Sequence, residues 1–133
     1  MATIDLSAPP KDIIVAQGAT IEVPLAITRN KQPYDLTGFT LRMQVRKNFS
    51  STQVLINATT QNGKLVWQDQ AGGTFKLLLA ESDTATAGNP LIVFPKDTDV
   101  LDCVFDIEVV SLDGFVYKVA RGSFSVEREV TRV

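Results

Sequence analysis

The sequence contains no histidine and only one cysteine, Cys103. Histidine is the commonest general base near neutral pH and the commonest nitrogen ligand of zinc. Its absence excludes a Ser–His–Asp triad and most zinc-dependent chemistry. A single cysteine can form neither an intrachain disulfide nor a thiolate cluster. The sequence therefore excludes the disulfide-rich secreted scaffolds and several large classes of hydrolase.

Motifs for binding phosphate or metal are also missing. Gly72-Gly73 is not followed by the Gly-Lys-Ser/Thr of a phosphate-binding loop. Asp97, Asp99 and Asp102 form the densest acidic patch, but the glycine and terminal glutamate of a calcium loop do not follow. A solvated loop is the simpler interpretation of that patch. Two carboxylates suffice for glycoside hydrolysis, yet the acidic residues here fall on exposed strand positions or in loops. We predict no enzyme activity, no metal and no cofactor.

Long apolar runs and concentrated charge are scarce. The longest apolar stretches, Leu77–Ala80 and Leu91–Phe94, are far shorter than the roughly 20 residues of a membrane-spanning helix. No basic segment followed by an apolar run begins the sequence, so we expect no signal peptide. The 13 basic residues are spread singly against 15 acidic ones, which gives a net charge of −2. A nucleic-acid binder needs a basic patch. Neither a membrane nor a nucleic acid is an expected partner.

Alternation of apolar and polar residues runs through most of the chain. It is clearest in Phe39–Arg46, where every second residue from Phe39 to Val45 is apolar. A period of two places one set of side chains in a core and the other in solvent, as in a β-strand. Similar patterns predict strands at Ile13–Ala16, Ile21–Ile27, Gln53–Thr60, Lys64–Gln68, Phe75–Leu79, Leu91–Phe94, Cys103–Ser111, Phe115–Ala120 and Gly122–Glu127. Strands do not alternate with helices. The sequence predicts a single all-β domain over residues 1–133, an antiparallel β-sandwich of Ig-like or jelly-roll type with one short helix.

Local signals predict where the chain turns. Asn62-Gly63 and Asp113-Gly114 are each flanked by β-rich runs, a pattern typical of a hairpin. Pro24 has no N–H, so the strand around it should lie at a sheet edge or carry a bulge. The one predicted helix is Glu81–Ala87, with Ser82 as its candidate N-cap.

A polar stripe on one strand is a candidate interface. Arg42, Gln44 and Arg46 share the face of the Phe39–Arg46 strand that points away from the core. A face that pairs with a partner subunit and a solvated face both fit this stripe.

The two termini are further candidates for contacts between subunits. Residues 1–12 are predicted to form an extended arm, and residues 127–133 a charged tail that includes Glu127, Arg128 and Arg132. A free terminus is usually poorly ordered unless something ties it down. We therefore expect a neighbouring copy to hold the arm in a trimer or ring. Deleting residues 1–12 is expected to leave the sandwich folded and to impair assembly.

Three aromatic residues, Tyr34, Trp67 and Tyr117, are candidates for a carbohydrate platform. Such residues are more commonly core or rim aromatics with a polar end at the surface. A carbohydrate-binding module would need at least two of them exposed on one sheet face. Cys103 alternates with polar residues and is predicted to be a buried small hydrophobe.

The order of the motifs resembles that of a known family. Pro33-Tyr-Asp-Leu-Thr-Gly-Phe-Thr-Leu-Arg-Met-Gln-Val-Arg46 resembles a segment common in small structural proteins of tailed phages. Asp106-Ile-Glu-Val, Asp113-Gly114 and Gly122-Ser-Phe-Ser-Val-Glu-Arg-Glu-Val-Thr-Arg132 do so too. Over roughly residues 13–132 the chain is similar to the N-terminal β-sandwich domain of siphophage baseplate upper proteins.

This resemblance implies a non-enzymatic virion structural protein that is made in the host cytoplasm. It implies a symmetric oligomer in the tail or baseplate, or at a tail-fibre joint, with other virion proteins and copies of itself as partners. Capsid decoration is the alternative within this class, and a carbohydrate-binding module for host recognition is the alternative outside it. The family has no catalytic residues to carry over to this sequence.

Overall fold

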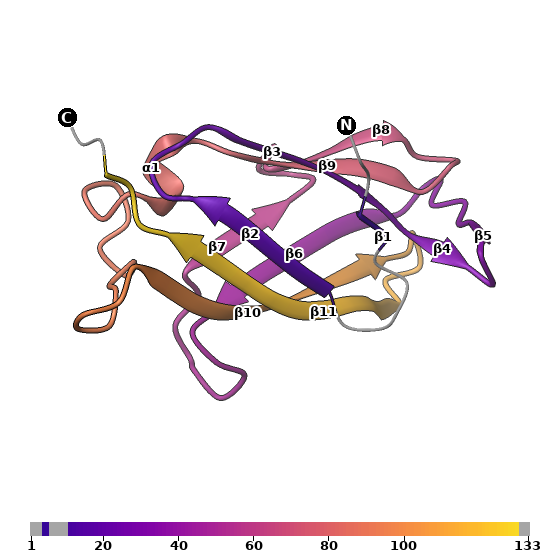
Figure 1. Cartoon of the computed structure of the whole chain (residues 1–133). Coiled ribbons are helices and arrows are strands. Elements are labelled where there is room, and N and C mark those ends of the chain that lie inside the picture. Colours follow the sequence, from indigo (N-terminus) through magenta and orange to yellow (C-terminus); the bar gives the residue numbers. More distant parts are fainter. Residues whose placement is uncertain (1–3, 6–10, 131–133) are drawn as a thin grey trace.

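Two β-sheets pack face to face in the computed structural model, which describes residues 4–5 and 11–130 (Figure 1). The elements are β1 Ile4–Asp5, β2 Lys11–Ala16, β3 Ile21–Ala26, β4 Thr28–Arg29, β5 Gln32–Pro33, β6 Thr40–Arg46, β7 Ile56–Thr59, β8 Leu65–Asp69, β9 Thr74–Leu79, α1 Glu81–Thr84, β10 Val100–Val110 and β11 Val116–Glu127. One sheet has the order β1-β3-β9-β8, and the other has the order β2-β11-β10-β6-β7. The predicted fold class, an all-β sandwich with one short helix, is confirmed. No helix in the described part of the chain could cross a membrane.

The strand order is that of an immunoglobulin-like sandwich. With the small β4–β5 hairpin taken as part of a connection, β3, β9 and β8 correspond to strands B, E and D. Likewise β11, β10, β6 and β7 correspond to G, F, C and C′. The N-terminal segment adds one edge strand to each sheet, β1 to the first and β2 to the second. Of the two sandwich types that the sequence predicts, the structure has the Ig-like one.

Inward residues of the alternating strands form the core. In β6, Leu41, Met43 and Val45 are each 1% exposed. β10, the central strand of its sheet, buries every second residue from Leu101 to Val109. The predicted inward assignments of Leu41, Met43, Phe105 and Ile107 are confirmed. Because burying apolar surface is the main favourable term in folding, this pattern fixes which face of each strand points inward.

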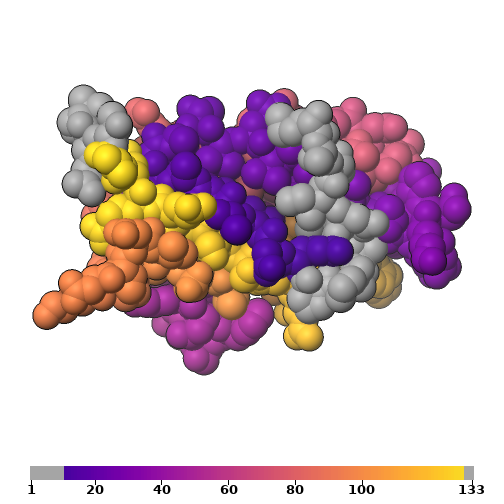
Figure 2. Space-filling view, in the orientation of Figure 1, coloured from indigo at the N-terminus to yellow at the C-terminus, as the bar shows by residue number. Residues whose placement is uncertain are grey.

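Both N-terminal strands pair in parallel with the body of the domain. Ile4–Asp5 lies beside Leu25–Ala26 of β3, and β2 lies along the last half of β11. Figure 2 shows β2, in indigo, against the yellow end of the chain. Parts of the predicted arm are thus edge strands of the chain's own sheets; its residues 1–3 and 6–10 lie outside the described residues. Within the described part, β1 covers β3 only at Leu25 and Ala26, so β3 remains an edge at Pro24, as predicted.

The prediction of a hairpin at Asn62-Gly63 is wrong. β7 pairs with β6 in one sheet, while β8 pairs with β9 in the other. The turn therefore carries the chain across the sandwich. Its backbone is satisfied by the Asn62 side chain, whose Oδ1 accepts from the N–H of Thr59 (2.9 Å) and Lys64 (3.0 Å). No strand pairing between β7 and β8 is needed to hold it.

The hairpin predicted at Asp113-Gly114 is confirmed, because Val110 of β10 pairs with Val116 of β11. Gly114 has φ 84°, a left-handed conformation that glycine adopts without a steric cost. The two strands predicted at Phe115–Ala120 and Gly122–Glu127 are one continuous strand, β11. A bulge opposite Ile107 and Glu108 adjusts its register.

The prediction of a strand at Leu91–Phe94 is also wrong. Ile92 is buried, with 1% of its surface exposed, whereas Leu91 and Val93 are 40% and 56% exposed. The segment inserts one side chain into the core without joining a sheet.

The helix is shorter than predicted and has a different N-cap. It covers Glu81–Thr84 and begins after Ala80, so Ser82 lies inside its first turn. The N–H of Ala80 donates to Oδ2 of Asp83 over 2.8 Å. This bond ties down the helix start without a serine side chain.

Candidate functional site

Charged side chains cover the outer face of the β2-β11-β10-β6-β7 sheet in ordered columns. We define the charged face by seven residues on β6, β10 and β11: Arg42, Gln44, Arg46, Asp106, Glu108, Lys118 and Arg121. In the ladder, Arg42 lies opposite Glu108, and Glu108 lies opposite Lys118. Asp106 lies between Gln44 and Arg121. Asp106 and Glu108 of β10 are thus flanked on both sides by strands that carry cations.

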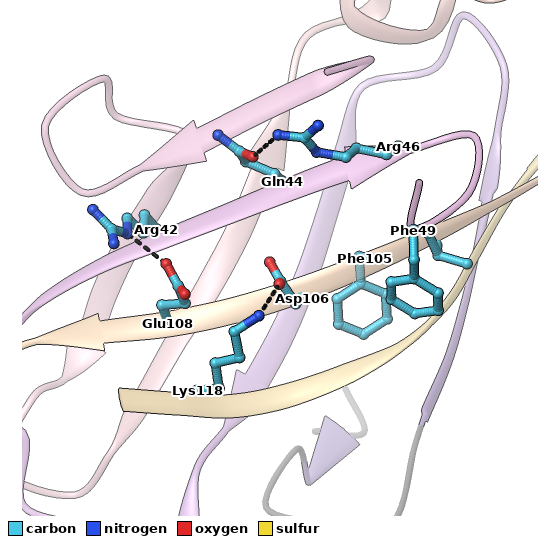
Figure 3. Close-up of a pocket in the computed structure, with 9 residues that line it drawn as sticks. Arg42, Gln44, Arg46, Phe49, Phe105, Asp106, Glu108 and Lys118 are labelled. Atoms are coloured by element: carbon cyan, nitrogen blue, oxygen red, sulfur yellow. Dashed lines mark hydrogen bonds and ion pairs between the residues drawn. The ribbon is translucent and has the colours of Figure 1, made fainter. Parts of the chain in front are cut away.

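Two ion pairs cross the strands of the charged face (Figure 3). Arg42 Nε lies 2.7 Å from Glu108 Oε1, and Lys118 Nζ lies 3.3 Å from Asp106 Oδ2. The side chains of Arg42 and Lys118 are 49% and 72% exposed. Exposed pairs of this kind contribute about 0–1 kcal/mol each. They orient the charges of this face and add little to stability.

Arg46 is held in place by uncharged groups. Its Nη1 donates to the carbonyl oxygen of Ser51 over 2.6 Å, and its Nη2 donates to Gln44 Oε1 over 2.9 Å. Neither Arg46 nor Arg121 forms an ion pair with a carboxylate of the described residues. A guanidinium has five N–H donors. Arg46 therefore presents an oriented, uncompensated cation with donors left for an external acceptor.

Six residues of the charged face, all except Arg121, line a groove of about 570 Å³ over β6 and β10, and Phe49, Val104 and Phe105 complete its lining. We call it the charged groove. Phe49, on the loop after β6, is 66% exposed, whereas Phe105 is 1% exposed. A rigid arginine beside an exposed aromatic is the composition found at the energetic centre of protein interfaces.

The structure brings together the three strand residues predicted as an interface, Arg42, Gln44 and Arg46, but does not add the tail to them. Glu127 ends β11 and pairs with Val100 and Ala16. Arg128 donates from its backbone N–H to Asp99 O over 2.8 Å, and its guanidinium lies 4.5 Å from the ring centroid of Phe94. These contacts place it at another end of the domain. Arg132 lies outside the described residues.

Six residues that line the charged groove were absent from the predicted interface: Phe49, Val104, Phe105, Asp106, Glu108 and Lys118. Asp106 and Glu108 alternate with core residues, so the sequence predicts that their side chains point outward. Their proximity to Arg42 could not be predicted, because it depends on the pairing of strands that are distant in sequence.

None of the three aromatic candidates for carbohydrate binding lines the charged groove. Trp67 packs edge-on against Phe75 with a centroid distance of 6.0 Å, and Tyr34 packs partly against the core. Tyr117 is 50% exposed, and it lines a second groove together with Tyr34. Tyr117 belongs to β11, whereas Tyr34 follows β5, so the two do not form a platform on one sheet face.

Neither the acidic patch nor the cysteine shows features of a reactive site. Among the described residues no group of three or more His, Cys, Asp or Glu side chains is arranged to hold a metal ion. Cys103 is 3% exposed, as predicted. Burial, and secondarily the negative charge of Asp102, raises the pKa of its thiol to about 11. A thiol with this pKa is protonated at neutral pH and is a poor nucleophile.

Comparison with known proteins identifies a related fold. No family model and no curated protein matches the sequence. Among solved structures, the N-terminal domain of phage TP901-1 ORF48 superposes on 96% of this chain and 94% of that domain, with a TM-score of 0.50 and 13% identity. The chain shares the fold of a phage protein domain. The resemblance stated from the sequence is confirmed at the level of the fold.

A second solved structure covers the chain but is less similar. CopC from Methylosinus trichosporium OB3b aligns with 100% of this chain and 91% of its own, at 13% identity and a TM-score of 0.39. At that TM-score the likeness carries no argument about function.

Proposed function

We propose that this chain is a non-enzymatic structural protein of a bacteriophage virion, and that it acts by docking neighbouring proteins through the charged groove. The observation that carries the proposal is the fold shared with the phage TP901-1 ORF48 domain over nearly the whole of both chains. The motif order of the sequence, which resembles phage baseplate upper proteins, supports it independently.

The charged groove supports a role in docking. Phe49 offers an exposed aromatic anchor, and Arg46 offers an oriented cation. Interface energy concentrates in such aromatic and arginine residues, while the surrounding contacts exclude water. The ion pairs Arg42–Glu108 and Lys118–Asp106 keep the groove polar enough to remain solvated before a partner arrives.

Within the virion we propose the tail or baseplate, or a tail-fibre joint, as the position of the protein, in a symmetric oligomer. Capsid decoration is the competing position. The carbohydrate-binding alternative gains no support from the arrangement of Tyr34, Trp67 and Tyr117, because they do not share an exposed sheet face.

Mass spectrometry of virions tests this proposal. Particles produced from the genome that encodes this chain would be purified through a density gradient, and their proteins would be quantified. We expect the chain at a fixed copy number per particle. A chain that is abundant in the lysate but absent from purified particles would overturn the proposal.

A variant of the charged groove tests the docking role. Arg46→Glu replaces the oriented cation with an anion, and we expect it to reduce the amount of the chain in particles. Lys31→Glu, at the exposed tip of the β4–β5 hairpin, makes the same change of charge away from the groove and serves as the control. Equal incorporation of both variants would show that the groove is not the docking surface.

A further inference from the structure

The charged groove carries more positive than negative charge. Three basic residues line it, Arg42, Arg46 and Lys118, against two acidic ones, Asp106 and Glu108, and Arg121 lies opposite Asp106 on β11. The two acidic residues are already paired, with Arg42 and Lys118. Arg46 and Arg121 therefore remain without a carboxylate from the described residues. Charge complementarity calls for a partner that brings at least two carboxylates to this face.

Residues 91–99, which precede β10, present such carboxylates on a different surface of the same chain. This acidic loop carries Asp97 and Asp99, and its one cation is Lys96. The side chain of Asp99 is 92% exposed and forms an ion pair with Arg128 Nε at 3.7 Å. Asp97 is also exposed. Figure 2 shows this orange segment projecting from the body of the domain.

Hydrogen bonds hold the backbone of the acidic loop in one conformation. Thr98 N–H donates to Pro95 O over 3.2 Å, and Arg128 donates to Thr98 O (3.2 Å) and Asp99 O (2.8 Å). Asp97 adopts φ 62°, a left-handed conformation that aspartate tolerates better than most residues. A loop already held in one conformation loses little further entropy when it binds.

Apolar residues match across the two surfaces. Leu91, Val93 and Val100 in and beside the acidic loop are 40%, 56% and 39% exposed. On the groove, Phe49 is 66% exposed, and Val104 lines the wall. The groove thus combines a net positive charge, and residues 91–99 a net negative charge, with apolar side chains in contact with water.

We infer that the acidic loop of a second copy of this chain fills the charged groove. The inference deepens the proposed function and rests on it, since it names the occupant of the same site. The loop and the groove are different surfaces, so the contact is head-to-tail, and such contacts close into a ring when the rotation permits. A contact made by one loop falls in the small class of interfaces, so we expect micromolar affinity that weakens as salt screens the charges.

Charge reversal on both sides tests the inference. Arg46→Glu makes the groove acidic, and Asp97→Arg with Asp99→Arg makes the loop basic. Sedimentation velocity of the purified full chain would be measured at low and high salt, over micromolar to millimolar concentrations. We expect the unmodified chain to associate at low salt and each variant alone to bind about tenfold or more weakly, because like charges then face each other. An equimolar mixture of the two variants should associate again, since each loop meets a groove of opposite sign.

Controls separate this result from loss of folding. Arg121→Glu, at an exposed position on β11, should weaken association without disturbing the Gln44 and Ser51 contacts of Arg46. Lys31→Glu should associate like the unmodified chain. A chain that stays monomeric throughout, or a mixture that fails to regain association, would overturn the inference.

The inference and the proposed function fail in different ways. If the groove holds another virion protein, Arg46→Glu is lost from particles whereas the Asp97→Arg, Asp99→Arg variant is retained. That outcome overturns the second-copy inference and leaves the proposed function standing. Absence of the unmodified chain from purified particles would overturn the proposed function itself.

Discussion

Truncating Phe105 should remove a large part of the stability of the domain. Phe105 lies on β10, the central strand of its sheet, and is 1% exposed. Its neighbours in the ladder are Val45 on one side and Gly122 on the other. Because glycine has no side chain that could relax into the space, Phe105→Ala leaves much of its cavity open. We expect a loss of about 4 kcal/mol, inside the range of about 3–5 kcal/mol for buried Phe→Ala changes.

Urea unfolding measures this loss. With a denaturant slope of about 2 kcal/mol per molar, a loss of about 4 kcal/mol lowers the midpoint by about 2 M. Single domains have unfolding free energies of about 5–15 kcal/mol, so the variant should fold but only marginally. The slope should stay the same, because the fold and its buried area are retained.

Phe49→Ala is the matched control, since Phe49 borders the same groove but is 66% exposed. Its effect should stay within about 0.5 kcal/mol, as for other surface substitutions. Arg42→Ala should be similarly mild, because an exposed ion pair contributes about 0–1 kcal/mol. A Phe105→Ala midpoint equal to that of the unmodified chain would refute the placement of Phe105 in the core.

Four further predictions concern Cys103, Gly122 and Asn62. Cys103 should not react with Ellman's reagent at about pH 8 in the folded chain, because the pKa of its buried thiol is about 11; fast reaction would contradict this. The unfolded thiol ionises first, so the free energy of unfolding should fall as pH rises from about 9 through about 11 in a titration of urea midpoints. Gly122→Ala should lower the free energy of unfolding in urea by about 1–3 kcal/mol, because a methyl group there collides with the Lys11 carbonyl of β2. An unchanged urea midpoint would refute this close approach. Asn62→Ala should cost about 1–2 kcal/mol in thermal unfolding, because two backbone N–H groups lose their acceptor, whereas an unchanged melting temperature would show that the turn holds without it.

The core and the fold class could be predicted from the sequence because both depend on local alternation. In β6, every second residue is apolar, and those residues are the buried ones. The same is true of β10. A one-residue change of register would expose the whole apolar set, so the pattern leaves little freedom.

Strand partners could not be predicted in the same way. Asn62-Gly63 carries the chemistry of a turn, but that chemistry does not say whether the chain returns to the same sheet or crosses to the other. Here the apolar faces of β7 and β8 belong to opposite sheets of the sandwich. The prediction of a strand at Leu91–Phe94 was wrong for a related reason. An apolar run forms a strand only where it can pair with the free edge of a sheet.

Only part of the charged groove could be predicted from the sequence. Arg42, Gln44 and Arg46 follow from the alternation of β6, but their acidic neighbours come from β10, more than 60 positions later. The tail residue Arg128 looked free and instead packs over Phe94. Both outcomes depend on contacts between distant segments, for which a single sequence holds no direct signal.

We propose that this domain is a virion part joined to its neighbours through the charged groove. Cryo-electron microscopy of the parent particle would show this contact. We expect a map that places the sandwich in the tail or baseplate with the outer face of β6, β10 and β11 against protein, and with a carboxylate near Arg46. A particle that contains the sandwich with this face open to solvent, or that lacks it altogether, would contradict the account.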